Sequence, residues 1–348
     1  MQYPGYRSGG RFPVQSYQPP WNPYGGLSPR AYGERQGIRR VSLGLSVAFL
    51  VFFGAQFLFQ MLLMGGLLIA GYSLRDMYAL LMEPGFVWVQ QVALSALVFT
   101  IPFLISIKVC RQRIGRVLPL GGVTPSLFVP LVMSGLGVCM LGNLATNILG
   151  QTLSAFQLVP VQPVMENPDG IFGAALVILG SAFLPALVEE FAFRGVALGL
   201  LRPYGDSFAI VISSLLFGLM HGNLVQTPFA IVVGLGLGYI TVAANSMWPA
   251  IVAHFLNNLF ATLLNEWMSG MSPTAYMLAN NGYVLALLVV GLIGAAWLTA
   301  KRPAAFRLHP SPCALDSKGR YAAFLGHPLM IVVLALFGLT MVMVQFSF

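Results

Sequence analysis

The feature that most constrains this chain is a series of long apolar segments that recurs from residue 42 to residue 345. A transmembrane helix needs about 20 mostly apolar residues, and several of the segments reach this length. Charged residues make up only 8% of the chain, whereas soluble domains average about 25%. Because so few charges cannot cover a surface in water, the sequence predicts an all-α polytopic membrane protein.

We expect about eight or nine transmembrane helices in one bundle, each long enough or sufficiently enclosed to cross the bilayer. Two short, Gly-rich segments suit helices enclosed by others, because small residues allow close helix packing. The expected spans cover residues 42–70, 87–107, 127–148, 171–201, 207–224, 228–244, 248–267, 283–300 and 329–345.

Residues 1–40 differ from the rest, because they are rich in Pro, Gly, Tyr and Gln and poor in aliphatic side chains. Such a segment has little to bury, so we predict a disordered tail followed by a membrane domain over residues 41–348. The first long apolar run starts near Val41. This is too late and the run is too long for a secretory signal, so none is expected.

The distribution of Lys and Arg predicts which side of the membrane each loop occupies. Basic residues fill the N-terminal tail and the loops around residues 108–116, 202 and 301–320, whereas the opposite loops carry only Arg75. Cytoplasmic loops are enriched in Lys and Arg, so we expect a cytoplasmic N-terminus in the cell (plasma) membrane.

The net charge of +8 arises from the Lys and Arg residues of the tail and these loops, whose positions follow membrane topology. We therefore expect no nucleic-acid partner. The three cysteines fall in different segments without CxxC spacing. They indicate neither a disulfide framework nor a zinc knuckle.

Ionisable residues inside a membrane are costly, and each is a hypothesis for a functional site. Glu190 and Arg194 are four residues apart on one expected helix, so we predict an ion pair between them. Glu189 points about 100° away from Glu190, which leaves its carboxylate available as a general base. The alternative is that these charges cap a helix end at the membrane interface.

Two further polar groups occur on later helices. Phe217 and His221 lie one turn apart, as do His254 and Asn258, which can both donate hydrogen bonds to a developing oxyanion. Alternatively, His221 only donates to a backbone carbonyl, and His254 and Asn258 only join helices. A rise of about 1.5 Å per residue gives Glu189 and these polar groups overlapping depths, so we expect one water-accessible cavity.

The motifs E-E-x-x-x-R at 189–194, F-x-x-x-H at 217–221 and H-x-x-x-N at 254–258 resemble those of a known family. This is the CPBP family of intramembrane peptidases, named for CAAX proteases and bacteriocin processing, also called ABI. It includes the type II CAAX prenyl endopeptidases. The resemblance covers about residues 171–268, which we take as the catalytic core of the membrane domain.

The resemblance implies hydrolysis of a peptide bond within the membrane by a glutamate-peptidase mechanism. Glu189 and His221 would activate a water molecule, and His254 and Asn258 would stabilise the oxyanion. Structural support is implied for Glu190, Arg194 and Phe217. The expected substrate is a membrane-associated or lipidated protein or peptide, and the sequence specifies neither prenylation nor the oligomeric state.

Metal dependence stays open, because Glu189, His221 and His254 could together form a catalytic zinc site. Asn258 suits an oxyanion donor better than a zinc ligand, which favours an enzyme without a cofactor. Two other classes of function are a proton-coupled transporter, since membrane Glu, His and Arg also form proton relays, and a non-catalytic scaffold or immunity protein.

Overall fold

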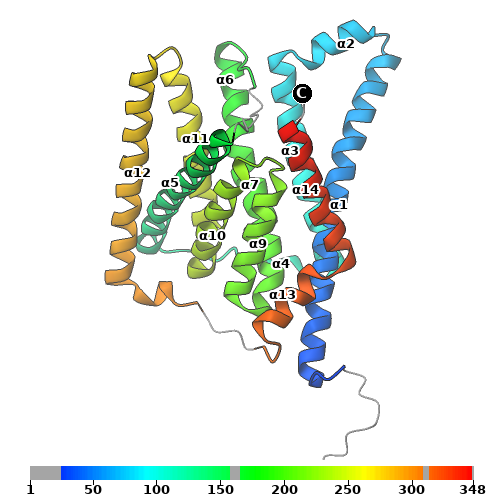
Figure 1. Cartoon of the computed structure of the whole chain (residues 1–348), viewed down its shortest axis with the longest axis vertical. Helices are drawn as coiled ribbons and strands as arrows, with labels where there is room; N and C mark the ends of the chain where they lie inside the picture. The colour runs from blue at the N-terminus through cyan, green and yellow to red at the C-terminus, as the bar shows by residue number, and fades with distance from the viewer. Residues whose placement is uncertain (1–24, 157–164, 309–312, 347–348) are drawn as a thin grey trace, which may run out of the picture.

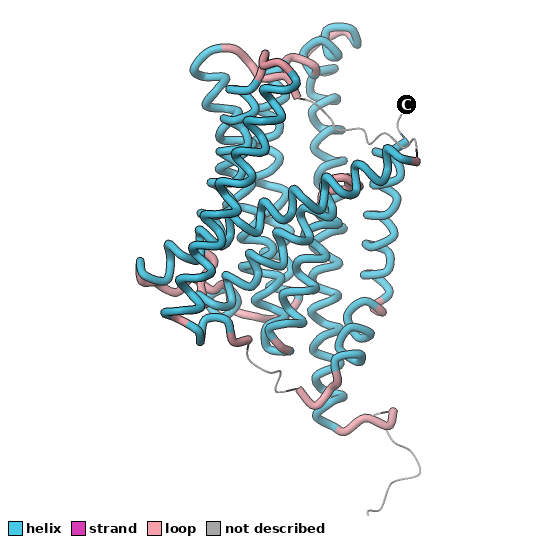
Figure 2. Tube along the Cα trace, turned by 60° about the vertical axis from the view of Figure 1, so that its left-hand side comes forward, coloured by secondary structure: helices cyan, strands magenta, loops and turns pink. Residues whose placement is uncertain are grey.

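The computed structural model describes residues 25–156, 165–308 and 313–346, where the regular elements are helices (Figures 1 and 2). One isolated bridge pair, between Leu120 and Ser246, accompanies them. The predicted all-α class is therefore confirmed. The disorder predicted for residues 1–24 lies outside the described residues.

Every expected span corresponds to a helix or to a segmented helix. The long helices are α1 (Pro29–Ile69), α3 (Pro84–Val109), α5 (Pro125–Ala155), α9 (Asp206–Met220), α10 (Gln226–Ala244), α11 (Trp248–Met268), α12 (Pro273–Lys301) and α14 (Pro328–Phe346). The segmented helix runs from Gly170 to Leu201. Short elements are α2 (Leu74–Leu81), α4 (Ile114–Val117), α13 (Ser317–Leu325) and the 3-10 turns η3 (Arg202–Tyr204) and η4 (Pro303–Phe306).

Length and apolar character together separate these helices into two sets. Within the described ranges, six helices are long and apolar enough to cross a membrane, or seven if the bent pair α13–α14 is one span. The 15-residue α9 falls below that length, and α11 is also outside the set. Most of α9 is buried among other helices, whereas α11 is buried mainly in its first half and exposes Leu263 and Trp267 near its end.

The boundary predicted for the N-terminal tail at residue 40 is wrong, because α1 begins at Pro29. The side chain of Ser28 accepts a backbone N–H of the first turn at 3.2 Å, and proline suits the first helical position. The Glu34 carboxylate also accepts the backbone N–H of Leu315 at 2.8 Å. A cap and a distant contact therefore order residues 29–40, although their composition is polar.

The helices form one bundle with α12 at one edge and α1 at the opposite edge (Figure 1). One buried cluster joins α1, α3, α9, α13 and α14 to the segmented helix, and a second joins α5, α10, α11 and α12. Phe229 on α10 packs against both clusters. The residues that sequence analysis selected come from helices on both sides of this boundary.

Glycines allow close approach where helices cross, as expected for the Gly-rich segments. A Cβ atom on Gly234 of α10 would lie 2.8 Å from the Cβ of Ser214 on α9. At the crossing of α5 and α12, a Cβ on Gly137 would lie 2.8 Å from the Cα of Gly291. Backbones this close leave no space for a larger side chain.

The outer face of the bundle is apolar, as a lipid-facing surface must be. Large hydrophobic side chains are exposed on several long helices, among them Phe57, Leu62, Ile101, Leu285 and Leu292. A soluble protein would bury contiguous side chains of this kind. With at least six helices able to cross a bilayer in the described ranges, the chain is a multi-pass integral membrane protein.

We predict that Gly291→Leu lowers the thermal midpoint of the detergent-solubilised protein, by a free energy of unfolding of about 1–3 kcal/mol. The new side chain would force α12 away from Gly137 on α5. Gly282→Leu on the same helix is the control, because a Cβ there meets no atom within 4 Å. Equal midpoints for the two variants in a melting assay would contradict the close crossing.

Candidate active site

The expected single helix over 171–201 is segmented by two π turns. The segments are α6 (Gly170–Ile178), the π segment η1 (Leu179–Phe183), α7 (Leu184–Glu190), the π segment η2 (Phe191–Ala197) and α8 (Leu198–Leu201). π turns are rare and are frequently found at functional sites. Here they flank the short helix whose last two residues are Glu189 and Glu190, so both carboxylates lie at a local change of helix geometry.

A proline and a polar side chain accompany the first π segment. Pro185 has no backbone N–H, so it cannot donate to the carbonyl of Ser181 four residues earlier. Asn258 Nδ2 of α11 donates to that carbonyl at 3.2 Å, and Asn258 Oδ1 accepts from Asn257 Nδ2 at 3.1 Å. These bonds fix the orientation of the Asn258 amide while leaving it a second N–H.

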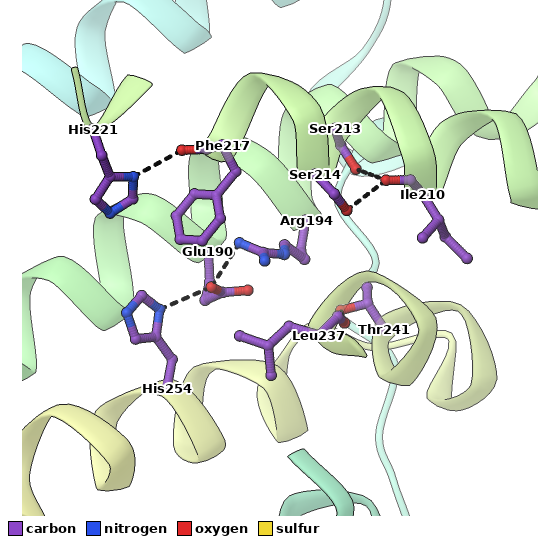
Figure 3. Close-up of polar contacts among 10 residues, drawn as sticks. All are labelled: Glu190, Arg194, Ile210, Ser213, Ser214, Phe217, His221, Leu237, Thr241 and His254. Atoms are coloured by element: carbon purple, nitrogen blue, oxygen red, sulfur yellow. Dashed lines mark hydrogen bonds and ion pairs between the residues drawn. The ribbon is translucent and has the colours of Figure 1, made fainter. Parts of the chain in front are cut away.

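Glu190 is the buried centre of the polar network. Its Oε1 atom accepts hydrogen bonds from Arg194 Nη1 and from His254 Nδ1, each at 2.9 Å (Figure 3). The side chains of Glu190 and Arg194 are 0% and 1% exposed. The predicted ion pair is therefore confirmed, and its full burial contradicts the alternative of a helix cap at the interface.

Phe217 lies among the charged and imidazole groups of the site (Figure 3). The Arg194 guanidinium carbon is 4.3 Å from the centroid of the Phe217 ring, a cation–π contact. The rings of His221 and His254 meet it edge-on at centroid distances of 5.0 and 6.2 Å. One aromatic ring thus spaces both histidines and covers the arginine.

His221 follows the last residue of α9, and its ring has a defined tautomer. Its Nδ1 atom lies 2.8 Å from the carbonyl oxygen of Phe217. Because a carbonyl only accepts, Nδ1 carries the hydrogen, and the neutral ring keeps a lone pair on Nε2. His221 thus donates to a backbone carbonyl, as the alternative interpretation expected, but only through Nδ1. Its Nε2 atom stays available for chemistry.

The four residues expected to carry catalysis line one cavity of about 410 Å³. They are Glu189, His221, His254 and Asn258, contributed by α7, the end of α9, and α11. Glu189 is partly exposed and makes no hydrogen bond or ion pair with the described residues, whereas the adjacent Glu190 is buried. The expected convergence is confirmed, and the catalytic roles stay predictions.

Sequence analysis missed several residues of the same cavity. Ser181 and Thr262 bond to each other at 3.0 Å and join the segmented helix to α11. A signal was present, since Ser181 lies eight residues before Glu189 and Thr262 four after Asn258, on the same helix faces. Other lining residues come from helices without a motif and include Trp88, Gln91, Gln226 and Phe229.

The Glu and His side chains that line this cavity are not positioned as one metal-binding group. No group of three or more His, Cys, Asp or Glu side chains suited to a metal ion occurs among the residues that the structure describes. The Nδ1 atoms of His221 and His254 both bond to protein atoms, and Glu190 takes the second of these bonds. These bonds leave both Nε2 atoms free, as in metal-bound histidines, so zinc held by Glu189, His221 and His254 stays an alternative to be tested.

The fold and the cavity together define a polytopic membrane protein with Glu and His side chains in one cavity of its helix bundle, residue types that can activate water. Comparison with protein families agrees, because residues 171–260 match the model of "Type II CAAX prenyl endopeptidase Rce1-like". The resemblance to the CPBP family that the three motifs predicted is therefore confirmed over this part of the chain.

A curated relative extends the similarity. The chain is 26% identical over 125 residues to a Bacillus subtilis (strain 168) protein named "Putative membrane peptidase YdiL". The aligned region is 36% of this chain, and the chain spans about half the length of that relative, 49%. No solved structure matches the chain. The comparisons thus associate the motif region with membrane peptidases.

We predict that Arg194→Met destabilises the protein by about 3–5 kcal/mol, because it leaves the Glu190 carboxylate buried without its partner charge. The double variant Arg194→Met, Glu190→Gln should recover much of this loss, since Gln can still accept from His254. Thermal midpoints in detergent measure both. The control is Arg30→Met, which removes the exposed partner of Glu34 and should change the thermal midpoint little. A double variant no more stable than the single one would contradict the charge argument.

Proposed function

We propose that the protein is an intramembrane endopeptidase of the glutamate-peptidase type. The observation that supports this proposal is the shared cavity of Glu189, His221, His254 and Asn258 inside a transmembrane bundle. Peptide hydrolysis needs a base, a water molecule and oxyanion donors around one substrate carbonyl. The cavity offers the base and the donors from separate helices, with room for water beside them.

In the proposed reaction, Glu189 takes a proton from a water molecule. The other O–H of that water donates a hydrogen bond to Nε2 of His221. The resulting hydroxide attacks the carbonyl carbon of the scissile bond and forms a tetrahedral oxyanion. Glu189 then gives its proton to the leaving amine nitrogen as the carbon–nitrogen bond breaks. The first products are a carboxylic acid and an amine, and Glu189 returns to its ionised form. The acid then gives its proton to the amine, which leaves a carboxylate and an ammonium group.

The oxyanion is stabilised by the free N–H of Asn258 Nδ2 and by His254. Since Nδ1 of His254 donates to Glu190, His254 can donate to the oxyanion only from a protonated Nε2. The ring then carries both hydrogens while it faces the Glu190 carboxylate. In this mechanism Glu190 and Arg194 act on catalysis through His254, and Phe217 acts through both histidines.

The site favours a substrate that reaches it from the membrane, namely a membrane-associated or lipidated protein or peptide. Its cavity lies between transmembrane helices and is lined by both apolar and polar side chains, including Trp88, Phe229 and Val233. The proposed location is the cell membrane with a cytoplasmic N-terminus, which the distribution of Lys and Arg supports.

We expect Glu189→Gln and His221→Ala to fold normally but to lose peptidase activity by about 10²–10⁴-fold, the usual contribution of a general base. Membranes from cells that produce wild-type or variant protein can be compared for new protein N-termini by mass spectrometry. This measurement does not require the substrate to be identified beforehand. A chelator added to wild-type membranes tests the zinc alternative in the same assay.

The control is Glu266→Gln, which changes an exposed carboxylate on α11 that does not line the cavity. It should leave every wild-type cleavage in place. Cleavage products that persist in Glu189→Gln at wild-type levels, or no product that depends on the protein, would contradict the proposed function.

We further expect Asn258→Ala to lower kcat by about 10²–10³-fold with a smaller change in KM, as for other oxyanion donors. Once a cleaved peptide is known, steady-state kinetics in detergent measures the split. His254→Ala should cost more, because it also removes a partner of Glu190. An Asn258 variant with normal kcat would assign this amide to helix packing alone.

A further inference from the structure

A second and larger cavity, of about 700 Å³, lies at the end of the bundle and shares no lining residue with the candidate active site. It is lined by the α4 loop (residues 115–121), by the turn between α8 and α9 (residues 199–206) and by Asn245 after α10. Candidate spans end at Tyr204 and Ala244 beside it. The cavity is therefore at the level where helices leave the bilayer.

The charged side chains that line this cavity are two arginines and one aspartate. Arg116 is exposed, and its side chain makes no hydrogen bond or ion pair within the described residues. Arg202 is held in place, since its Nε donates to Asp206 at 3.1 Å and its Nη1 to Asn245 at 2.7 Å. Asp206 thus neutralises Arg202, and Arg116 supplies a net positive charge.

We propose that this cavity binds the phosphate group of an anionic phospholipid through Arg116 and the remaining guanidinium N–H groups of Arg202. Guanidinium groups match phosphate oxygens in geometry and charge, and basic pockets between helices at the interface suit lipid headgroups. The membrane around the bundle provides this ligand at high local concentration. The inference does not depend on the proposed peptidase activity.

Binding at this cavity is expected to stabilise the segmented helix that carries the Glu190–Arg194 ion pair. The α4 loop lies directly on α8, where a Cβ on Gly199 would collide with the carbonyl oxygen of Val117. A Cβ on Gly195, the residue after Arg194, would lie 2.9 Å from a methyl group of Leu118. A lipid that joins Arg116 of the loop to Arg202 would therefore hold the loop against this helix.

The experiment uses the full chain in detergent micelles with added dioleoylphosphatidylglycerol, dioleoylphosphatidylcholine or inorganic phosphate, and it measures the thermal midpoint. A ligand that binds only the folded state stabilises it by RT ln(1 + [L]/Kd), so the midpoint rises with ligand concentration. We expect phosphatidylglycerol to raise it, and phosphatidylcholine and inorganic phosphate at the same concentration to have little effect.

The matched variants are Arg116→Glu and Arg113→Glu, which change the net charge equally. Arg113 is also exposed and lies three residues earlier, directly before α4, but it does not line the cavity. For the same rise in midpoint, Arg116→Glu should need at least about tenfold more phosphatidylglycerol than wild type, because it loses one charged hydrogen bond. Arg113→Glu should behave like wild type.

Two outcomes would overturn the proposal. Equal losses in Arg116→Glu and Arg113→Glu would mean that general charge, and not this cavity, attracts the lipid. An equal shift with inorganic phosphate, lost in Arg116→Glu, would make a free anion the ligand and would exclude the phospholipid as its source.

Discussion

The structure depends on the burial of the Glu190 carboxylate. A charge without water is stable only if donors surround it, and here Arg194 and His254 both bond to Oε1. Arg194 in turn covers the ring of Phe217 on α9. Three helices that are far apart in sequence are thus held in one register by a group that tolerates little displacement.

This arrangement gives two adjacent glutamates different environments. Glu190 is fully buried and paired, whereas Glu189 reaches the cavity and makes no ion pair with the described residues. The two glutamates lie at the end of α7, which has a π segment on either side and contains Pro185, a residue without a backbone N–H. One carboxylate is therefore buried and paired, while the other faces the cavity, as the proposed general base would.

Elements outside the region that resembles the peptidases pack against it through aromatic rings. Phe217 contacts Phe193 at a centroid distance of 5.1 Å, Phe193 contacts Phe49 on α1 at 6.2 Å, and Phe49 contacts Phe337 on α14 at 5.2 Å. These edge and tilted contacts are directional as well as apolar. They connect the first and last long helices to the ring that spaces the two histidines.

Much of the candidate site could be predicted from the sequence, because spacing of four residues on a helix states which side chains share a face. The Glu190–Arg194 pair is of this kind, and the overlapping depths of the polar groups predicted that the four cavity residues meet. The bond between His254 and Glu190 was not predictable, since it crosses 64 positions of the chain and depends on how α11 packs on α7. The helical N-terminal boundary was missed because it rests partly on the contact of Glu34 with Leu315.

The sequence by itself determined that the chain is a helical membrane bundle, because its apolar segments are too long and its charges too few for a fold in water. It also predicted which polar residues gather inside the bundle. Only the tertiary structure decided that Glu190 is paired twice, that Glu189 reaches a cavity and that two π turns flank both. The reason is physical: helix periodicity is local, whereas burial and pairing arise only where distant helices come into contact.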